Sequence, residues 1–509
     1  MKKIINVLIF ATLTYSCFAQ NIEITSPLTY VGEADVPSDN NGNLCAKIVI
    51  ETSINGIDIV GGYIISDVAE TNRGYEFYVS VPRKEGQYVT LFHEELNSLT
   101  FPLWQNGALK RGSEYVINVK GGAEMSMKGL YANSDLQYID VSTLKTAIAN
   151  DMSEMFLGCK KLVSIDLSGF NTAGVTNMKE MFQGCKSLTS LDLKSFNTYK
   201  VTNMSSLFKD CSCLTTLNLG SFNTSNVTDM SKMFESCHEL KNIDLSGFNT
   251  SNVTDVSYMF AFCEKIKSIN ISSFNTSNVS NMSGMFGWCE ELTDIDLSSF
   301  NTSNVIDMSK MFTYCKNLTS LELKQFNTLN VTDMSYMFEN CQSLKSLDLG
   351  NFVTSNVTNM SNLFEGCKEL TNIDLNTFNT INVANMSWMF KDCQKLESID
   401  LCSFNTSNVE GMSEMFCGCQ NLTTLNLSNF NTSNLIGMNF MFAGCQNLRF
   451  IDLSNFNADK STKEWMTGMF SECKSLQAIK VTNCNKTTIA KLKEALIEAG
   501  IQNQVELVK

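Results

Sequence analysis

Cysteines are the most regularly placed residues with chemical potential in this 509-residue chain. Thirteen of its 19 cysteines form a lattice with steps of 26 residues and a last step of 28. The lattice consists of Cys159, Cys185, Cys211, Cys237, Cys263, Cys289, Cys315, Cys341, Cys367, Cys393, Cys419, Cys445 and Cys473. Structural zinc requires cysteines about two to four residues apart, closely enough to share one ion. Only two single C-x-C pairs, Cys211 with Cys213 and Cys417 with Cys419, come near this spacing, so we expect no metal and no cofactor.

The same lattice could form disulfides or pack as small apolar side chains. Disulfides are common in exported chains, but they require Cα atoms within about 7 Å. The lattice cysteines end a helical pattern, and packed helices lie roughly 8–10 Å apart. We therefore predict reduced, buried thiols. The redox state of Cys402, Cys417 and Cys484 stays open, and a local pair between Cys402 and Cys417 is one alternative.

Residues for acid–base catalysis are scarce. The chain has two histidines, His93 near the N-terminus and His238 at a variable position after a lattice cysteine. Two histidines are too few to supply more than one nucleophile–base pair or to form a metal site of several histidines. We therefore expect a protein that is not an enzyme.

Acidic residues recur in a second column, between two apolar residues of the pattern Leu-Asp-Leu. This acidic column consists of Asp166, Asp192, Asp244, Asp296, Glu322, Asp348, Asp374 and Asp400, with Asn218 and Asn270 between them. Alternation of period two places these side chains on the outer face of a strand. They form either a solvated polar stripe that discourages sheet aggregation, or a docking stripe for basic ligands, or weak cation sites.

Aromatic residues interrupt the repeat at one place. Phe262, Trp288 and Tyr314 each precede a lattice cysteine in three consecutive repeats, and Tyr258 lies four residues before Phe262. Two interpretations remain open. The rings either pack against each other locally, or they form a recognition patch for a protein or a glycan.

The elements that must position these side chains follow from the repeat itself. One unit reads C-x-x-L-x-x-L-D-L-x-x-F-N-T-S-N-V-T-D-M-S-x-M-F-x-x. A fixed period of this size indicates a solenoid, and L-x-x-L-x-L is the leucine-rich-repeat pattern. Met178, Met181, Phe182 and Cys185 have helical spacing, and Asn177 is a candidate N-cap. We predict one short strand and one short helix per unit, stacked into a leucine-rich-repeat solenoid with a parallel sheet.

The units C-x-x-L-x-x-L-D-L, each closed by M-F-x-x-C, resemble the BspA-like leucine-rich repeat surface proteins with the 26-residue bacterial surface repeat. The resemblance covers roughly residues 126 to 482. It implies a secreted or surface-attached adhesin that binds host extracellular-matrix proteins, cell-surface proteins or glycans, or other cells. It implies no catalytic residues. A structural surface spacer without a specific ligand is the alternative, favoured by the near-identity of the units.

The rest of the chain suggests export. Residues 1–19 have the form of a signal peptide, and lipidation at Cys17 is the alternative to plain cleavage. We expect a small antiparallel β-sandwich over residues 20–122, which resembles PEGA-like β modules, then the solenoid over 123–482 and a C-terminal cap over 483–509. The net charge of −14 disfavours nucleic acid as a partner. No later stretch is long and apolar enough for a transmembrane helix.

Overall fold

The computed structural model divides the chain into two compact units, Met1–Ser126 and Met127–Lys509. It describes residues 21–509 except 35, 39–43, 53–56, 61–63, 65, 67, 72–73, 80, 82–87, 93–98, 103–108, 110, 112, 123–124, 142–143, 145, 147–148 and 463. The predicted signal peptide, Cys17 and His93 lie outside the described residues.

The described residues of the first unit form two β-sheets, and most of their strand pairs are antiparallel, as predicted. The larger sheet has the order β1-β8-β2-β5-β4 and the smaller one the order β3-β6-β7. The strands are β1 (Asn21–Glu33), β2 (Ala46–Glu51), β3 (Asp58–Val60), β4 (Ala69–Thr71), β5 (Gly74–Val79), β6 (Tyr88–Phe92), β7 (Leu99–Pro102), β8 (Ser113–Gly122) and β9 (Met125–Ser126). Within these two sheets the pairing is antiparallel apart from β2 with β8, which run parallel. Ile48 and Phe77 are paired across β2 and β5 and fully buried.

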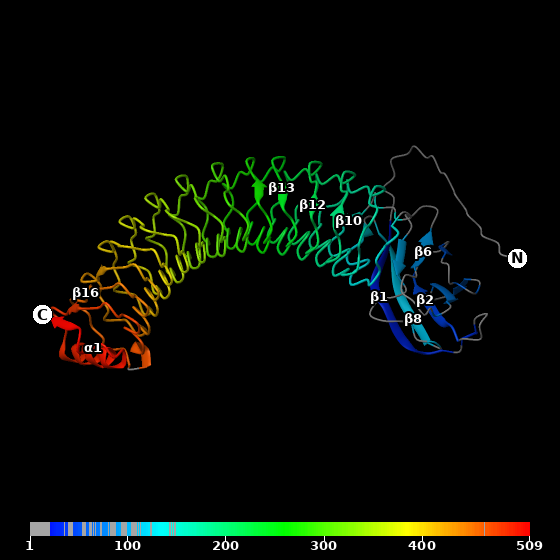
Figure 1. The fold of residues 1–509 in the computed structure, drawn as a ribbon. Helices are drawn as coiled ribbons and strands as arrows, with labels where there is room; N and C mark the ends of the chain where they lie inside the picture. The colour runs from blue at the N-terminus through cyan, green and yellow to red at the C-terminus, as the bar shows by residue number, and fades with distance from the viewer. Residues whose placement is uncertain are drawn as a thin grey trace. The chain divides into compact units, whose positions relative to one another are not determined.

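The second unit is a parallel solenoid whose coils follow one another along an arc (Figure 1). Equivalent residues of successive coils face each other 26 residues apart, as Ser190 faces Thr216. The strands are β10 (Ala149–Asp151), β11 (Ser190–Leu191), β12 (Thr216–Leu217), β13 (Asn242–Asp244), β14 (Ser268–Asn270), β15 (Thr424–Asn426), β16 (Phe450–Asp452), β17 (Ala478–Lys480) and β18 (Glu506–Val508). The predicted leucine-rich-repeat solenoid is therefore confirmed.

The short helix expected in each repeat does not form. In the M-x-x-M-F-x-x-C segment, alternate backbone N–H groups donate to the next coil, as Met178 does to Asn203 O at 3.0 Å and Glu180 to Ser205 O at 2.9 Å. The groups between them close tight turns, as Met181 N–H does to Met178 O. Glu180 has a φ of 58°, which a continuous helix does not allow. Residues with positive φ interrupt the hydrogen-bond pattern of a helix in this segment. Every second N–H group therefore bonds the neighbouring coil, and the segment forms a row of turns.

Unequal spacing of the coils accounts for the arc. On the side of each coil that carries the Met-Phe pair of the repeat, here called the M-F side, the ring centroids of Phe286 and Phe312 lie 5.6 Å apart. On the side that carries the Phe-Asn-Thr turn, here called the F-N side, the ring centroids of Phe274 and Phe300 lie 6.5 Å apart. The stack therefore bends toward the M-F side. Paired strands require a spacing of about 4.8 Å, and parallel pairing is intermittent on the wider side. Residues 271–423, all of which the structure describes, contain no strand.

Side-chain hydrogen bonds join the coils on the wider side. The threonine of each F-N-T turn is buried and bonds the backbone of the next coil. Thr302 Oγ1 donates to Asn327 O at 2.9 Å and accepts from Asn327 N–H at 2.7 Å. The asparagine before it caps its own turn, as Asn249 Oδ1 accepts the N–H of Ser251 at 3.0 Å. These bonds satisfy backbone groups that an interrupted sheet would leave unpaired.

The C-terminal coils end in a helix that lies within the predicted C-terminal cap. A 3-10 turn, η1 (Glu464–Met466), absorbs the two extra residues of the last repeat. Helix α1 (Lys486–Glu498) begins at Asn485, whose side chain accepts the N–H of Thr488. β18 then pairs in parallel with β17. Among the described residues, no helix combines the length and apolar character that a membrane crossing requires.

Candidate functional site: an aromatic ridge

The three predicted aromatic residues are brought together as a continuous stack, here called the aromatic ridge (Phe262, Trp288 and Tyr314). The rings of Phe262 and Trp288 lie 4.3 Å apart, centroid to centroid, with 13° between their planes. Those of Trp288 and Tyr314 lie 5.9 Å apart at 11°. All three side chains are half-buried. Burial raises the pKa of the Tyr314 hydroxyl above its ordinary value.

The backbone beneath the ridge is left-handed. Phe262, Trp288 and Tyr314 have φ values of 60°, 60° and 57°. Other coils place residues with positive φ at the same position, mostly small or polar ones: Gly158, Gly184, Asp210, Ser236, Asn340, Gly366, Asp392, Gly418, Gly444 and Glu472. Glycine and asparagine tolerate this conformation, whereas it costs other residues roughly 1–2 kcal/mol. Three consecutive coils therefore retain large rings where the backbone disfavours them.

Tyr258 belongs to a different column from the ridge. It also has a positive φ, and its ring covers Gly284 of the next coil so closely that a Cβ there would lie 2.6 Å from Cε1. Its ring therefore has a packing role. The same column carries Tyr336, Trp388 and Phe440, which the sequence reasoning missed. Comparing every column of the repeat, not only the one before cysteine, would have found them.

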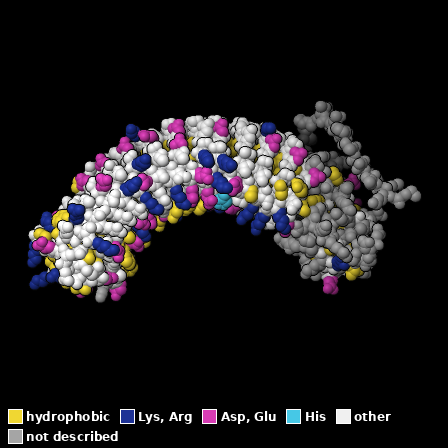
Figure 2. Space-filling model, in the orientation of Figure 1, with side chains coloured by type: hydrophobic (Ala, Val, Ile, Leu, Met, Phe, Trp, Pro, Cys, Tyr) yellow, Lys and Arg dark blue, Asp and Glu magenta, His cyan; other side chains and the backbone are white. Residues whose placement is uncertain are grey.

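Ion pairs border the ridge at the positions that follow the lattice cysteines. Lys316 Nζ lies 2.6 Å from Glu290 Oε1 and 5.7 Å from the centroid of the Tyr314 ring. His238 Nδ1 lies 3.5 Å from Glu264 Oε1, a pair that is charged only when the histidine is protonated. Figure 2 shows basic and acidic side chains intermixed over the face of the second unit that it draws. An apolar centre with a polar rim is the usual composition of a protein interface.

The acidic column has a local structural role. Each carboxylate that the sequence singled out is exposed. In the aspartates, Oδ1 accepts the N–H two residues later, as Asp244 does from Ser246 at 3.0 Å. The bonds from Ser246 and Ser298 hold the pKa of Asp244 and Asp296 below the usual range. Asn218 makes the equivalent bond to Gly220, which explains why asparagine substitutes for aspartate in this column. The same bond occurs at Asp166, Asp192, Asp348, Asp374 and Asp400.

Glu322 does not cap its turn in this way. Its backbone carbonyl accepts a long bond from Gln325 Nε2 at 3.4 Å, and its carboxylate lies 4.0 Å from Lys324 Nζ. All eight carboxylates of the column are exposed, so the column still presents a line of negative charge.

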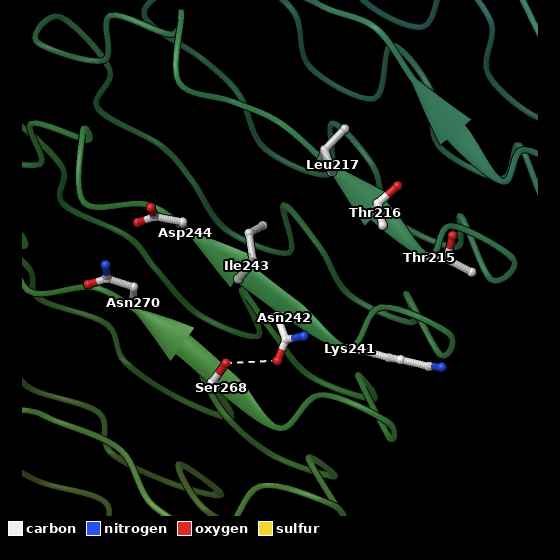
Figure 3. A pocket seen from close by; sticks show the side chains of 9 residues that line it. All are labelled: Thr215, Thr216, Leu217, Lys241, Asn242, Ile243, Asp244, Ser268 and Asn270. Carbon is white, nitrogen blue, oxygen red and sulfur yellow. Dashed lines mark hydrogen bonds between the residues drawn. The ribbon is translucent and has the colours of Figure 1, made fainter.

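An open hollow of about 600 Å³ lies on the strand side (Figure 3). It is lined by Thr215, Thr216, Leu217, Lys241, Asn242, Ile243, Asp244, Ser268 and Asn270. The hollow opens where β12 and β13 belong to separate sheets. Figure 3 shows Lys241 and Asp244 at opposite ends of β13, and Ser268 Oγ donates to Asn242 Oδ1 at 2.8 Å. The hydroxyl, amide and charged groups that line the hollow can form hydrogen bonds, but they do not form a catalytic arrangement.

The lattice thiols are buried and unpaired by disulfide in the structure. Each donates to a backbone carbonyl of the preceding coil, as Cys289 Sγ does to Phe260 O at 3.2 Å. Burial raises the pKa of Cys263 and Cys315 to about 12, which keeps them as inert thiols. Cys402 is exposed, and Cys417 and Cys484 are half-buried. Within the described part of the chain, no group of three or more metal-ligating side chains gathers.

Comparison with known proteins assigns the repeats to a family. Four overlapping stretches, 125–242, 213–320, 288–399 and 389–506, match the family described as Mycoplasma protein of unknown function, DUF285. The chain belongs to the DUF285 family. The matched stretches of this DUF285 protein cover the whole predicted repeat region, residues 126 to 482. No curated protein matches the chain.

The solved structures that are similar to this DUF285 protein include the following two. One is a leucine-rich repeat protein from Bacteroides ovatus, with 16% identity, a TM-score of 0.34 and coverage of 68% of this chain and 88% of that one. The other is a leucine rich cell surface protein from Faecalibacterium prausnitzii, with 14% identity, a TM-score of 0.34 and coverage of 81% and 98%.

Proposed function

We propose that this protein is an exported, non-catalytic surface protein that binds another protein through the aromatic ridge. The observation that carries the proposal is the stack of Phe262, Trp288 and Tyr314 on a left-handed backbone. Residues held in disfavoured backbone conformations cluster at functional sites. Tryptophan and tyrosine are also enriched among the anchors of interfaces. The partner is a host matrix or cell-surface protein, or a protein on another cell, which gives the chain the role of an adhesin.

The stacking favours a protein over a glycan. A sugar ring binds an aromatic side chain by lying on its face. Both faces of Trp288 are covered, one by Phe262 and the other by Tyr314. Lys316 Nζ lies over the Tyr314 ring. The ridge therefore offers mainly ring edges, which suit the apolar side chains of a protein.

Export and the lack of catalysis rest on the sequence. Residues 1–19 support secretion, with lipidation at Cys17 as the alternative that would hold the protein at the surface. The regularity of the coils and the two histidines support a binding role rather than an enzymatic one.

A pair of substitutions, Trp288→Asn with Tyr314→Asn, tests the proposal in the purified full chain. Asparagine stands at the same backbone position at Asn340, so the variant keeps a compatible residue. Binding to matrix proteins and to cells is expected to fall tenfold or more, about 1.4 kcal/mol. Trp388→Asn is the matched control, because it removes a ring from the other left-handed column, where Asn362 shows that asparagine fits.

The alternative function, a spacer without a specific ligand, is favoured by the near-identity of the coils. It predicts that the parent chain binds none of the proteins, glycans or cells offered. If the double variant folds and binds like the parent, the ridge is packing only and the proposal fails.

A further inference from the structure

Two glutamates beside the aromatic ridge differ from the other glutamates on the M-F side. Glu339 and Glu365 occupy the same position in adjacent coils, two residues before a lattice cysteine, and are here called the glutamate pair. Neither forms an ion pair with any residue that the structure describes. The other glutamates of the M-S-x-M-F-x-x-C-x-x segments each lie 3.5 Å or less from a lysine or histidine nitrogen. They are Glu154, Glu180, Glu235, Glu239, Glu264, Glu290, Glu291, Glu369, Glu414 and Glu472.

The two carboxylates of the glutamate pair are half-buried and close to each other. Burial, the largest cause, raises the pKa of both Glu339 and Glu365. The charge of Glu365 raises the pKa of Glu339 further, whereas the cation nearest to Glu365 along the stack is engaged elsewhere, since Lys391 Nζ lies 2.7 Å from Glu414 Oε2. A cation that contacted both carboxylates would therefore relieve their mutual repulsion and offset their desolvation.

A buried acceptor lies beside the glutamate pair. Asn362 Nδ2 donates to Glu365 Oε2, which places the other atom of the same amide, Oδ1, next to that carboxylate. Asn362 is only 6% exposed, and its Oδ1 accepts no hydrogen bond from the described residues. Buried polar atoms in folded proteins almost always have a hydrogen-bond partner. The unpaired oxygen therefore indicates a donor that comes from another molecule.

Two tyrosines border the glutamate pair. Tyr314 of the aromatic ridge donates its backbone N–H to Glu339 O at 2.6 Å, and Tyr336 O accepts the Glu339 N–H at 3.1 Å. After burial, the charges of Glu339 and Glu365 are the next causes that raise the pKa of both tyrosine hydroxyls, so both phenol groups lie near both carboxylates. Lys310 Nζ lies over the Tyr336 ring, 5.4 Å from its centroid, which shows that these rings accept a cation.

A planar cation with several N–H donors matches this combination of groups. A guanidinium group bonds carboxylates through its fork of N–H groups and stacks on aromatic rings, whereas an ammonium group is a compact point charge. We propose that the glutamate pair binds an arginine side chain of the protein that contacts the aromatic ridge. This inference rests on the proposed function, because it assigns a chemical feature to the partner of the ridge. The net charge of −14 also favours a basic partner.

The test uses Nα-acetyl-arginine amide as the probe and the purified full chain. Nα-acetyl-citrulline amide is the matched probe, because citrulline has nearly the shape of arginine but no charge. Saturation-transfer NMR titrations should give a dissociation constant on the order of 1 mM for the arginine amide and binding at least about tenfold weaker for the citrulline amide. Glu339→Gln with Glu365→Gln should weaken arginine binding by about tenfold or more, and circular dichroism should show an unchanged fold.

Glu239→Gln with Glu369→Gln is the matched control, because it removes two charges from the same side of the solenoid. Glu239 and Glu369 already pair with lysines at 2.7 and 2.6 Å, so this variant should bind the arginine amide as the parent does. Equal binding of the two amides by the parent would overturn the proposal. Undiminished arginine binding by the Glu339 and Glu365 variant would overturn it as well.

Calcium chloride is the remaining probe, since two carboxylates and an amide oxygen are also ligands that calcium accepts. Calorimetry that shows calcium binding to the parent but not to the Glu339 and Glu365 variant, without arginine binding, would assign the pair to a metal ion and overturn the proposal. The Trp288 and Tyr314 variants test the ridge separately with partner proteins. If they lose the partner while the parent fails to bind the arginine amide, the arginine site is wrong and the proposed function stands.

Discussion

Replacing one buried threonine with valine should loosen the joint between two coils. Thr302 is fully buried, and its hydroxyl both donates to Asn327 O and accepts from Asn327 N–H. Valine has nearly the same shape but makes neither bond. Two lost bonds at about 1 kcal/mol each, with the desolvation of groups left unpaired, give a loss of about 2–4 kcal/mol.

Urea unfolding of Thr302→Val, with hydrogen exchange to locate the damage, measures this loss. The Asn327 amide and its neighbours in adjacent coils should exchange faster, because solenoid stability depends on nearest-neighbour contacts. Thr332→Val is the control, since Thr332 is exposed and its hydroxyl makes a longer bond of 3.3 Å to Ile306 O. A change below about 0.5 kcal/mol for Thr302→Val, or equal effects of the two variants, would refute the reasoning.

Other predictions concern the core, the thiols and pH. Phe300→Ala should lower the free energy of unfolding by about 3–5 kcal/mol, because the ring is buried between Phe274 and Phe326. The damage should be local to the adjacent coils, and hydrogen exchange that rises equally in all coils would contradict this. The lattice thiols should resist alkylation in the native protein and react with the alkylating reagent after denaturation without reductant. If they stay unreactive after denaturation, the lattice cysteines are oxidised and this prediction is wrong. Burial, the largest cause, raises the pKa of Glu365, so the native state binds its proton more tightly than the unfolded chain, and stability should fall as pH rises through the carboxyl range. Glu365→Gln should therefore stabilise the protein at pH 7. Thermal melts should show this gain vanishing near pH 4, and a gain independent of pH would count against this account.

The period and the buried columns could be predicted from the sequence because each column keeps its chemical character. Leucine, phenylalanine and cysteine recur every 26 residues, and all three columns are buried in the structure. The burial of the lattice thiols was also predicted correctly, although for a different reason. They close a row of turns rather than helices, and each bonds a carbonyl of the preceding coil.

The missing helix could not be predicted from apolar spacing alone. Met178, Met181, Phe182 and Cys185 fit both a helix and a row of alternating turns, because the two place the same residues inside. The informative signal was the residue before cysteine, such as Gly184 or Asn340, which tolerates a positive φ. Likewise, the exchange of aspartate with Asn218 in the acidic column indicated a turn cap, since both side chains accept the same N–H.

The most direct test of the central claim places a photo-crosslinking residue in the aromatic ridge. The photoreactive amino acid p-benzoylphenylalanine, introduced at position 288, keeps an aromatic ring between Phe262 and Tyr314. Irradiation of the full chain with a bound partner should join this position covalently to the partner protein, whereas the same residue at position 388 should give little product. Equal yields at the two positions, or binding that persists with no product at position 288, would contradict a binding role for the ridge.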